Sequence, residues 1–135
     1  MQKTTTFLMF VGDKVGKAEE AMNFYISVFK NASIKGIERY DADSPTAKKG
    51  MVKMGIFTIE GQEYMVSENT APHQFTFTPA VSIFVQCENE EELTSLYTKL
   101  SEGGGVMMEL NNYGFSKKFA WVADRYGVSW QLNLE

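Results

Sequence analysis

The chain has 135 residues, of which 17 are acidic and 13 basic, so its formal net charge is −4. This length predicts a single domain of residues 1–135, because single cores commonly hold about 100–150 residues. An acidic chain does not favour non-specific binding to nucleic acid, which requires a basic surface. No apolar run approaches the roughly 18 residues that a membrane-spanning helix needs, so we also expect no membrane partner.

Cysteine usage and the first residues bear on the cellular compartment. Cys87 is the only cysteine, so the chain cannot form an internal disulfide. The opening residues, MQKTTTFLMFVGD, lack the apolar core and small-residue cleavage site of a signal peptide. Together these features predict a cytoplasmic protein.

The first half of the chain combines strand-like and helical patterns. Residues 4–11 are β-branched and aromatic, which predicts a strand. Residues 17–29 carry apolar side chains at helical spacing, which predicts an amphipathic helix with Glu19 and Glu20 at its favourable end. Three further strands are expected, at 33–40, 50–60 and 62–68.

The second half repeats this order after a loop. Residues 80–87 predict a strand, and residues 88–100 predict a helix that ends at the glycines of 103–105. Three more strands are expected, at 106–110, 118–124 and 128–135.

The repetition predicts two β-α-β-β-β modules. The expected segments are module one at about 4–68, a connecting loop at 69–79 and module two at 80–135. By position, Tyr64 corresponds to Trp130 and Met65 to Gln131. Each module is too small to close its own core, so we expect the sheets to pack into one curved surface with a concave pocket.

The segment VGDKVGKAEE (11–20) invites comparison with a phosphate-binding loop. Such a loop needs four residues between its first glycine and the Gly-Lys pair, followed by Ser or Thr. Here three residues intervene, and Ala18 occupies the hydroxyl position. The segment is therefore interpreted as a flexible connector between strand and helix.

The usual catalytic side chains are scarce. The only histidine, His73, lies in a polar loop and is expected at the surface. Cys87 ends a strand without a neighbouring histidine, which predicts a buried and inert thiol. An Asp-x-x-Gly turn from Asp124 to Gly127 is expected to shape the last hairpin, with the Asp124 side chain bonding the backbone two residues on.

Four segments carry a resemblance to a known family: EEAMNFYISVF, GQEYM, FTPAVSIFVQCENEEEL and WVADRYGVSWQL. In this order they resemble the PhnB-like branch (3-demethylubiquinone-9 3-methyltransferase-like) of the vicinal oxygen chelate superfamily, from about Phe7 to Leu134. The resemblance implies an α+β fold in which two βαβββ modules form a cupped mixed sheet, the glyoxalase/bleomycin resistance/dihydroxybiphenyl dioxygenase-like fold. It also implies a homodimer.

The resemblance further implies a divalent metal held by His, Gln or Glu from the first and last strands of each module. The corresponding positions here are Thr5, Phe7 or Met9, then Met65, Ala80 or Ser82, and Gln131. One amide and one hydroxyl fall short of the three or four donors that such an ion needs. We therefore expect a cup without a cofactor, and a divalent metal is disfavoured.

These substitutions make the implied cup apolar, which favours metal-independent binding of a small organic molecule. The expected lining is Phe7, Met9, Met65, Phe84, Trp121 and Trp130, with Ser82 and Gln131 as polar contacts. Phe84 and Trp130 are equally well explained as core residues. Three alternatives stay open: a metal-dependent lyase or dioxygenase, a methyltransferase as the family label implies, and a dimeric scaffold without a specific ligand. The sequence does not decide whether the protein is an enzyme.

Overall fold

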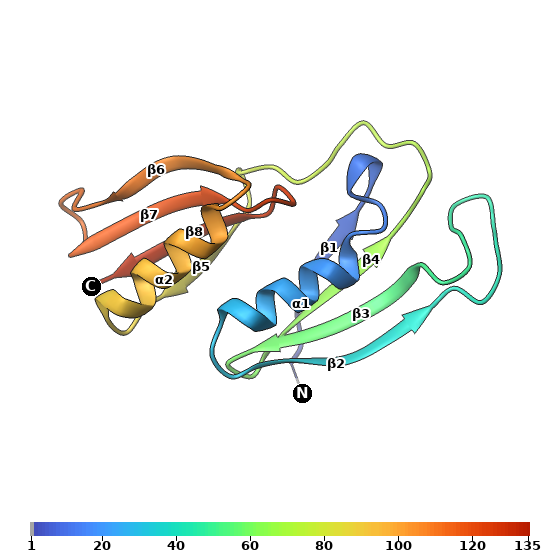
Figure 1. Ribbon diagram of the computed structural model, residues 1–135, viewed down its shortest axis with the longest axis horizontal. Coiled ribbons are helices and arrows are strands. Elements are labelled where there is room, and N and C mark those ends of the chain that lie inside the picture. The colour runs from blue at the N-terminus through green and yellow to red at the C-terminus, as the bar shows by residue number, and fades with distance from the viewer. Residues whose placement is uncertain (1) are drawn as a thin grey trace. The chain divides into compact units, whose positions relative to one another are not determined.

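The computed structural model describes residues 2–135, which form two α-helices and eight β-strands (Figure 1). The chain divides after Thr76 into two compact units. Each unit has one helix and one four-stranded sheet of its own. None of the helices in the described residues is long and apolar enough to cross a membrane.

In the first unit, one strand precedes the α-helix along the chain and three strands follow it. Its elements are β1 (Thr6–Phe10), a short 3-10 turn η1 (Gly12–Lys14), α1 (Ala18–Val28), β2 (Ala32–Arg39), β3 (Val52–Ile59) and β4 (Gln62–Glu68). The strand order in the sheet is β1-β4-β3-β2. Strand β1 runs parallel to β4, and the other pairs are antiparallel.

The second unit repeats this topology. Its elements are β5 (Ser82–Gln86), α2 (Glu90–Ser101), β6 (Gly105–Asn111), β7 (Lys118–Ala123) and β8 (Ser129–Leu134). The strand order is β5-β8-β7-β6, and β5 runs parallel to β8. The α+β class and the repeated βαβββ order predicted from the sequence are therefore confirmed. The first strand of each module is shorter than expected, and each pairs with a single neighbour in its sheet.

Helix α1 covers one face of the first sheet. Its buried side chains include Met22 and Tyr25, which are fully enclosed. Met22 lies against the backbone of Gly55, where an added methyl group would meet its side chain at 2.6 Å. The rings of Tyr25 and Phe57 lie 5.5 Å apart. Burial of this apolar stripe, rather than helix propensity, stabilises so short a helix.

Helix α2 covers one face of the second sheet in the same way (Figure 1). Leu93, Leu96 and Leu100 form its buried stripe, and Trp130 and Leu132 are fully buried in the sheet beneath it. Each sheet therefore has one face covered by a helix and an opposite face, here called the open face, that no helix of its own unit covers.

Candidate functional site

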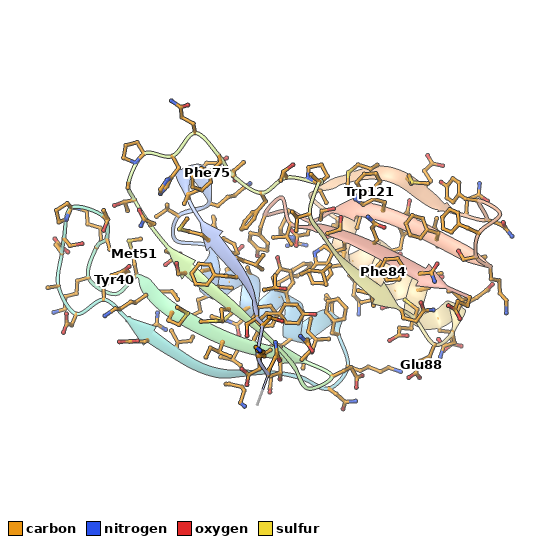
Figure 2. The ribbon with its side chains drawn as sticks, turned by 180° about the vertical axis from the view of Figure 1, so that it is seen from behind. Tyr40, Met51, Phe75, Phe84, Glu88 and Trp121 are labelled. Carbon is orange, nitrogen blue, oxygen red and sulfur yellow. The ribbon has the colours of Figure 1, made fainter. Side chains whose placement is uncertain are left out.

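The open face of the second sheet carries a row of three side chains on adjacent strands. The strand register places Phe84 of β5 beside Gln131 of β8, and Gln131 beside Trp121 of β7. Directly paired residues project from the same face of a sheet. Figure 2 views the molecule from the side opposite to Figure 1, and Phe84 and Trp121 lie there in front of the sheet, away from α2. The row is exposed at one end, since 57% of Phe84 is accessible.

Hydrogen bonds fix the polar part of this face. The indole Nε1 of Trp121 donates to Ser129 Oγ at 2.8 Å. The hydroxyl groups of Ser129 and Ser82 lie 2.7 Å apart. The Gln131 amide Nε2 donates to Ser82 Oγ at 3.4 Å. The two serines therefore hold both the plane of the indole ring and the direction of the amide.

More aromatic rings continue from the row. Phe119, on the same face of β7, lies 6.5 Å from Phe84 between ring centroids. Phe115, in the hairpin before β7, meets Phe119 edge to face at 5.0 Å and stacks on Tyr113 at 6.2 Å. Such ring distances are those of ordinary aromatic pairs. The open face therefore combines aromatic surface with a few fixed polar groups.

Trp130, expected to line the cup, lies instead on the helix-covered face. It is fully buried, and its Nε1 donates to Asp124 Oδ2 at 2.9 Å. One residue along a strand reverses the face, so Trp130 and Gln131 point to opposite sides. Asp124 also accepts from the Tyr126 backbone N–H at 2.9 Å, which confirms the predicted turn.

The remaining expected residues lie on the open face of the first sheet. Phe7 pairs with Met65, and Met65 with Ile56, at the same sheet positions as Phe84, Gln131 and Trp121. Met9 lies on this face two residues along β1 from Phe7. Phe7 is 48% exposed. This row is apolar throughout, whereas its counterpart in the second sheet has an amide at the centre.

The donors around Gln131 do not fit a divalent cation. They are an amide, two hydroxyl groups and an indole N–H, all without charge, whereas such ions prefer carboxylate and imidazole ligands. Within residues 2–135, no three His, Cys, Asp or Glu side chains gather as a metal site. We therefore derive no chemistry through a metal at this position.

The start of helix α1, which follows the glycine-containing segment compared with a phosphate loop, is hydrogen-bonded to a carboxylate of the protein. Glu68 is 2% exposed, and its Oε2 accepts from the Ala18 backbone N–H at 3.1 Å. Its Oε1 accepts from the Val52 backbone N–H at 2.8 Å. A buried negative charge at the helix N-terminus stabilises the dipole and repels an anionic ligand. The spacing of residues in the sequence gave no sign of this role for Glu68.

A pocket of about 320 Å³ opens beside this helix start. Its charged lining residues are Glu19, Glu68, Arg39 and Lys49. Arg39 Nη2 is bound to Glu19 Oε1 at 2.9 Å. Since the two positive and two negative side chains balance, the pocket does not select a charged ligand.

The surroundings of Cys87 and His73 bear on whether either side chain is reactive. Cys87 is 4% exposed; its burial raises the pKa of the thiol to about 12, Glu92 acts in the same direction, and a hydrogen bond from the Asn133 backbone opposes them. The expectation of a buried thiol is confirmed. His73 differs from the surface position expected: it is half-buried, its ring lies 4.6 Å from that of Phe75, and its Nε2 is shielded without a hydrogen-bond partner.

Comparisons with known proteins identify the family. The family model described as 3-demethylubiquinone-9 3-methyltransferase matches residues 2–133. A PhnB protein from Bacillus cereus is 52% identical over 99% of this chain and 100% of its own, with a TM-score of 0.90. The chain belongs to this PhnB-like family. The recognition from the four sequence segments is therefore confirmed.

More distant structures share the fold of this PhnB-like chain. Protein PA1353 from Pseudomonas aeruginosa is 23% identical, with coverage of 100% and 98% and a TM-score of 0.82. The fosfomycin resistance protein FosX from Listeria monocytogenes is 12% identical, with coverage of 100% and 91% and a TM-score of 0.63. FosX has the vicinal oxygen chelate fold, and both of these similarities bear on fold alone. The comparison with curated proteins found no match.

Proposed function

We propose that this PhnB-like protein binds a small organic molecule, without a metal ion, on the open face of its second sheet. The observation that carries the proposal is the row Phe84, Gln131 and Trp121, in which an amide lies between two aromatic side chains. Binding sites for small molecules commonly combine apolar and aromatic lining with a few fixed polar groups.

The exposure of the apolar side chains supports a ligand rather than a purely structural role. Phe84 leaves more than half of its surface in water, and Phe7 nearly half. Covering such surface is favourable by about 25 cal/mol per Å² of apolar area. Phe7, Met9 and Met65 give the first sheet an apolar open face of its own, which we propose as a separate binding surface.

The family name suggests methyl transfer, and the superfamily suggests metal-dependent lyases and dioxygenases. Within the described residues, the N-terminus of α1 after the glycine turn is hydrogen-bonded to the Glu68 carboxylate, and Gln131 has only neutral donors around it. Neither feature supports those reactions. The proposal is therefore limited to binding.

A thermal-shift screen of metabolites and antibiotic-like compounds tests the proposal. We expect at least one compound to raise the melting temperature, and the rise to persist in EDTA. Ser82→Ala and Gln131→Ala should abolish it, because they remove the fixed polar contacts. Ser95→Ala on α2 and Gln62→Ala at the start of β4 serve as matched controls outside the open face of the second sheet.

A rise that survives both open-face substitutions would show that the site lies elsewhere. A rise that disappears in EDTA would show that a metal is required. We also infer a homodimeric, cytoplasmic protein, supported by the unpaired edge strands and the single buried cysteine.

A further inference from the structure

Five side chains lie around the Gln131 side chain on the open face of the second sheet. Together with Gln131 we call this set the Gln131 frame; it consists of Ser82, Phe84, Phe119, Trp121, Ser129 and Gln131. Phe84 and Trp121 stand on either side of Gln131, on adjacent strands. Phe119 lies two residues along β7 on one side of the row, and the Ser82–Ser129 pair lies on the other.

Phe84 and Trp121 present aromatic surface on either side of the Gln131 side chain. Phe84 contacts the ring of Phe119, and within the described residues it has no ring contact with Trp121. More than half of Phe84 is exposed. An aromatic ring packed on this surface would cover apolar area that Phe84 leaves in water.

The hydrogen bonds of the frame converge on its two serines. The indole N–H of Trp121 can only donate, so the Ser129 hydroxyl accepts from it, and the hydroxyl groups of Ser129 and Ser82 share a second hydrogen bond in which either can be the donor. Gln131 donates one amide N–H to the Ser82 hydroxyl oxygen. The Gln131 carbonyl oxygen is left without a hydrogen bond from the residues that the structure describes.

The frame carries no charged side chain. A carboxylate or an ammonium group placed there would lose its hydration without gaining a counter-charge, which is unfavourable. A neutral ligand meets no such penalty.

From these observations we infer that the ligand class is a neutral, planar aromatic compound with an O–H or N–H donor on its edge. Its ring packs on the exposed aromatic surface of Phe84 and Trp121, and its donor binds the Gln131 carbonyl oxygen. The inference rests on the proposed function and specifies the chemistry of that same site.

Three naphthalene probes test the inference on the full-length, ¹⁵N-labelled protein. The probe 2-naphthol has the donor, 2-methoxynaphthalene has the same ring system without it, and 2-naphthoate carries a charge. Binding is followed by the indole N–H signals of the two tryptophans. Trp130 is an internal control, because its indole N–H is bound to Asp124 on the opposite face. Trp121→Phe assigns the signals.

We expect 2-naphthol to shift the Trp121 signal and to leave the Trp130 signal in place. It should bind about tenfold more tightly than 2-methoxynaphthalene, the value of one net hydrogen bond, and more tightly than 2-naphthoate. Gln131→Leu should remove the preference for 2-naphthol over 2-methoxynaphthalene. Phe84→Ala should weaken both neutral probes. Phe75→Ala, which removes an equally exposed ring from a loop of the first unit, should weaken neither.

Failure of the inference differs from failure of the proposed function. Equal binding of 2-naphthol and 2-methoxynaphthalene, with a shift of Trp121 and no effect of Gln131→Leu, would overturn the donor requirement while leaving an open-face site. Tighter binding of 2-naphthoate would overturn the neutral ligand class. If no probe shifts Trp121 at saturation, the aromatic class is wrong, and if the metabolite screen also yields no compound that depends on Ser82 and Gln131, the proposed function fails with it.

Discussion

At the scale of single residues, each unit contains one buried carboxylate that organises backbone N–H groups. Glu68 joins the start of α1 to the start of β3 through the N–H groups of Ala18 and Val52. Asp124 accepts from the Val128 N–H at 3.1 Å as well as from Tyr126 and Trp130. A buried carboxylate is tolerated when hydrogen bonds replace its lost hydration, so these bonds give both residues a structural role.

Removing the Glu68 carboxylate should destabilise the protein. Glu68→Ala leaves two buried N–H groups without an acceptor, so we expect a loss of about 3 kcal/mol in the free energy of unfolding. Glu68→Gln keeps one carbonyl oxygen and should fall between Ala and the native residue. Urea denaturation followed by circular dichroism measures both.

Glu63→Ala on the same strand is the matched control. Its carboxylate pairs with Lys35 at 3.1 Å in a largely exposed position, and such pairs contribute less than about 1 kcal/mol. Equal losses for the Glu63 and Glu68 substitutions would contradict the role assigned to Glu68.

At the scale of elements, the three glycines between α2 and β6 have different roles. Gly103 follows the helix end with a φ of +77°, which favours glycine. Gly104 approaches the end of β7 so closely that an added methyl group would collide with the backbone of Ala123 and Asp124. Gly105 faces open space. The three consecutive glycines therefore differ in role. A turn favours glycine at position 103 and a close backbone approach requires it at position 104, whereas position 105 is under no such constraint.

Substitution of these neighbours separates the roles. Gly104→Ala should lower the free energy of unfolding by about 3 kcal/mol, because backbone cannot move aside as a flexible side chain can. Gly105→Ala, one residue away, should change it by less than about 0.5 kcal/mol. Urea denaturation of both variants gives the comparison, and similar values would show that the turn before β6 does not approach the end of β7 as closely as described.

At the scale of the whole molecule, apolar surface remains exposed on the second unit. Val81 is 70% and Phe115 63% exposed, in addition to Phe84. Exposed apolar groups and unpaired strand edges favour association between copies of a chain.

The molecular mass of the protein in solution therefore tests whether it is a homodimer. Multi-angle light scattering at micromolar concentration should give twice the 15.2 kDa of one chain. The mass should persist in high salt, because screening weakens charge interactions and leaves apolar contacts intact. A monomer under these conditions would contradict the dimer.

The order of helices and strands was determined by the sequence alone, because apolar periodicity of 3.6 or 2 residues is a local property. The repeated module and the position of Gln131 in the last strand followed from the same local patterns, and the family followed from the resemblance of four sequence segments. Even the turn at Asp124 could be predicted, since its bonds reach only a few residues along the chain.

The tertiary structure alone decided which side chains meet. Trp130 and Gln131 are neighbours in sequence, yet one is core and the other lies on the open face. The Glu68 carboxylate accepts a hydrogen bond at the start of a helix 50 residues away, and Ser82 lies beside Ser129 on the adjacent strand. Such meetings depend on the pairing register, and a shift of one residue would exchange the two faces of a strand. No local pattern fixes that register, because it is set by the packing of the whole sheet against its helix.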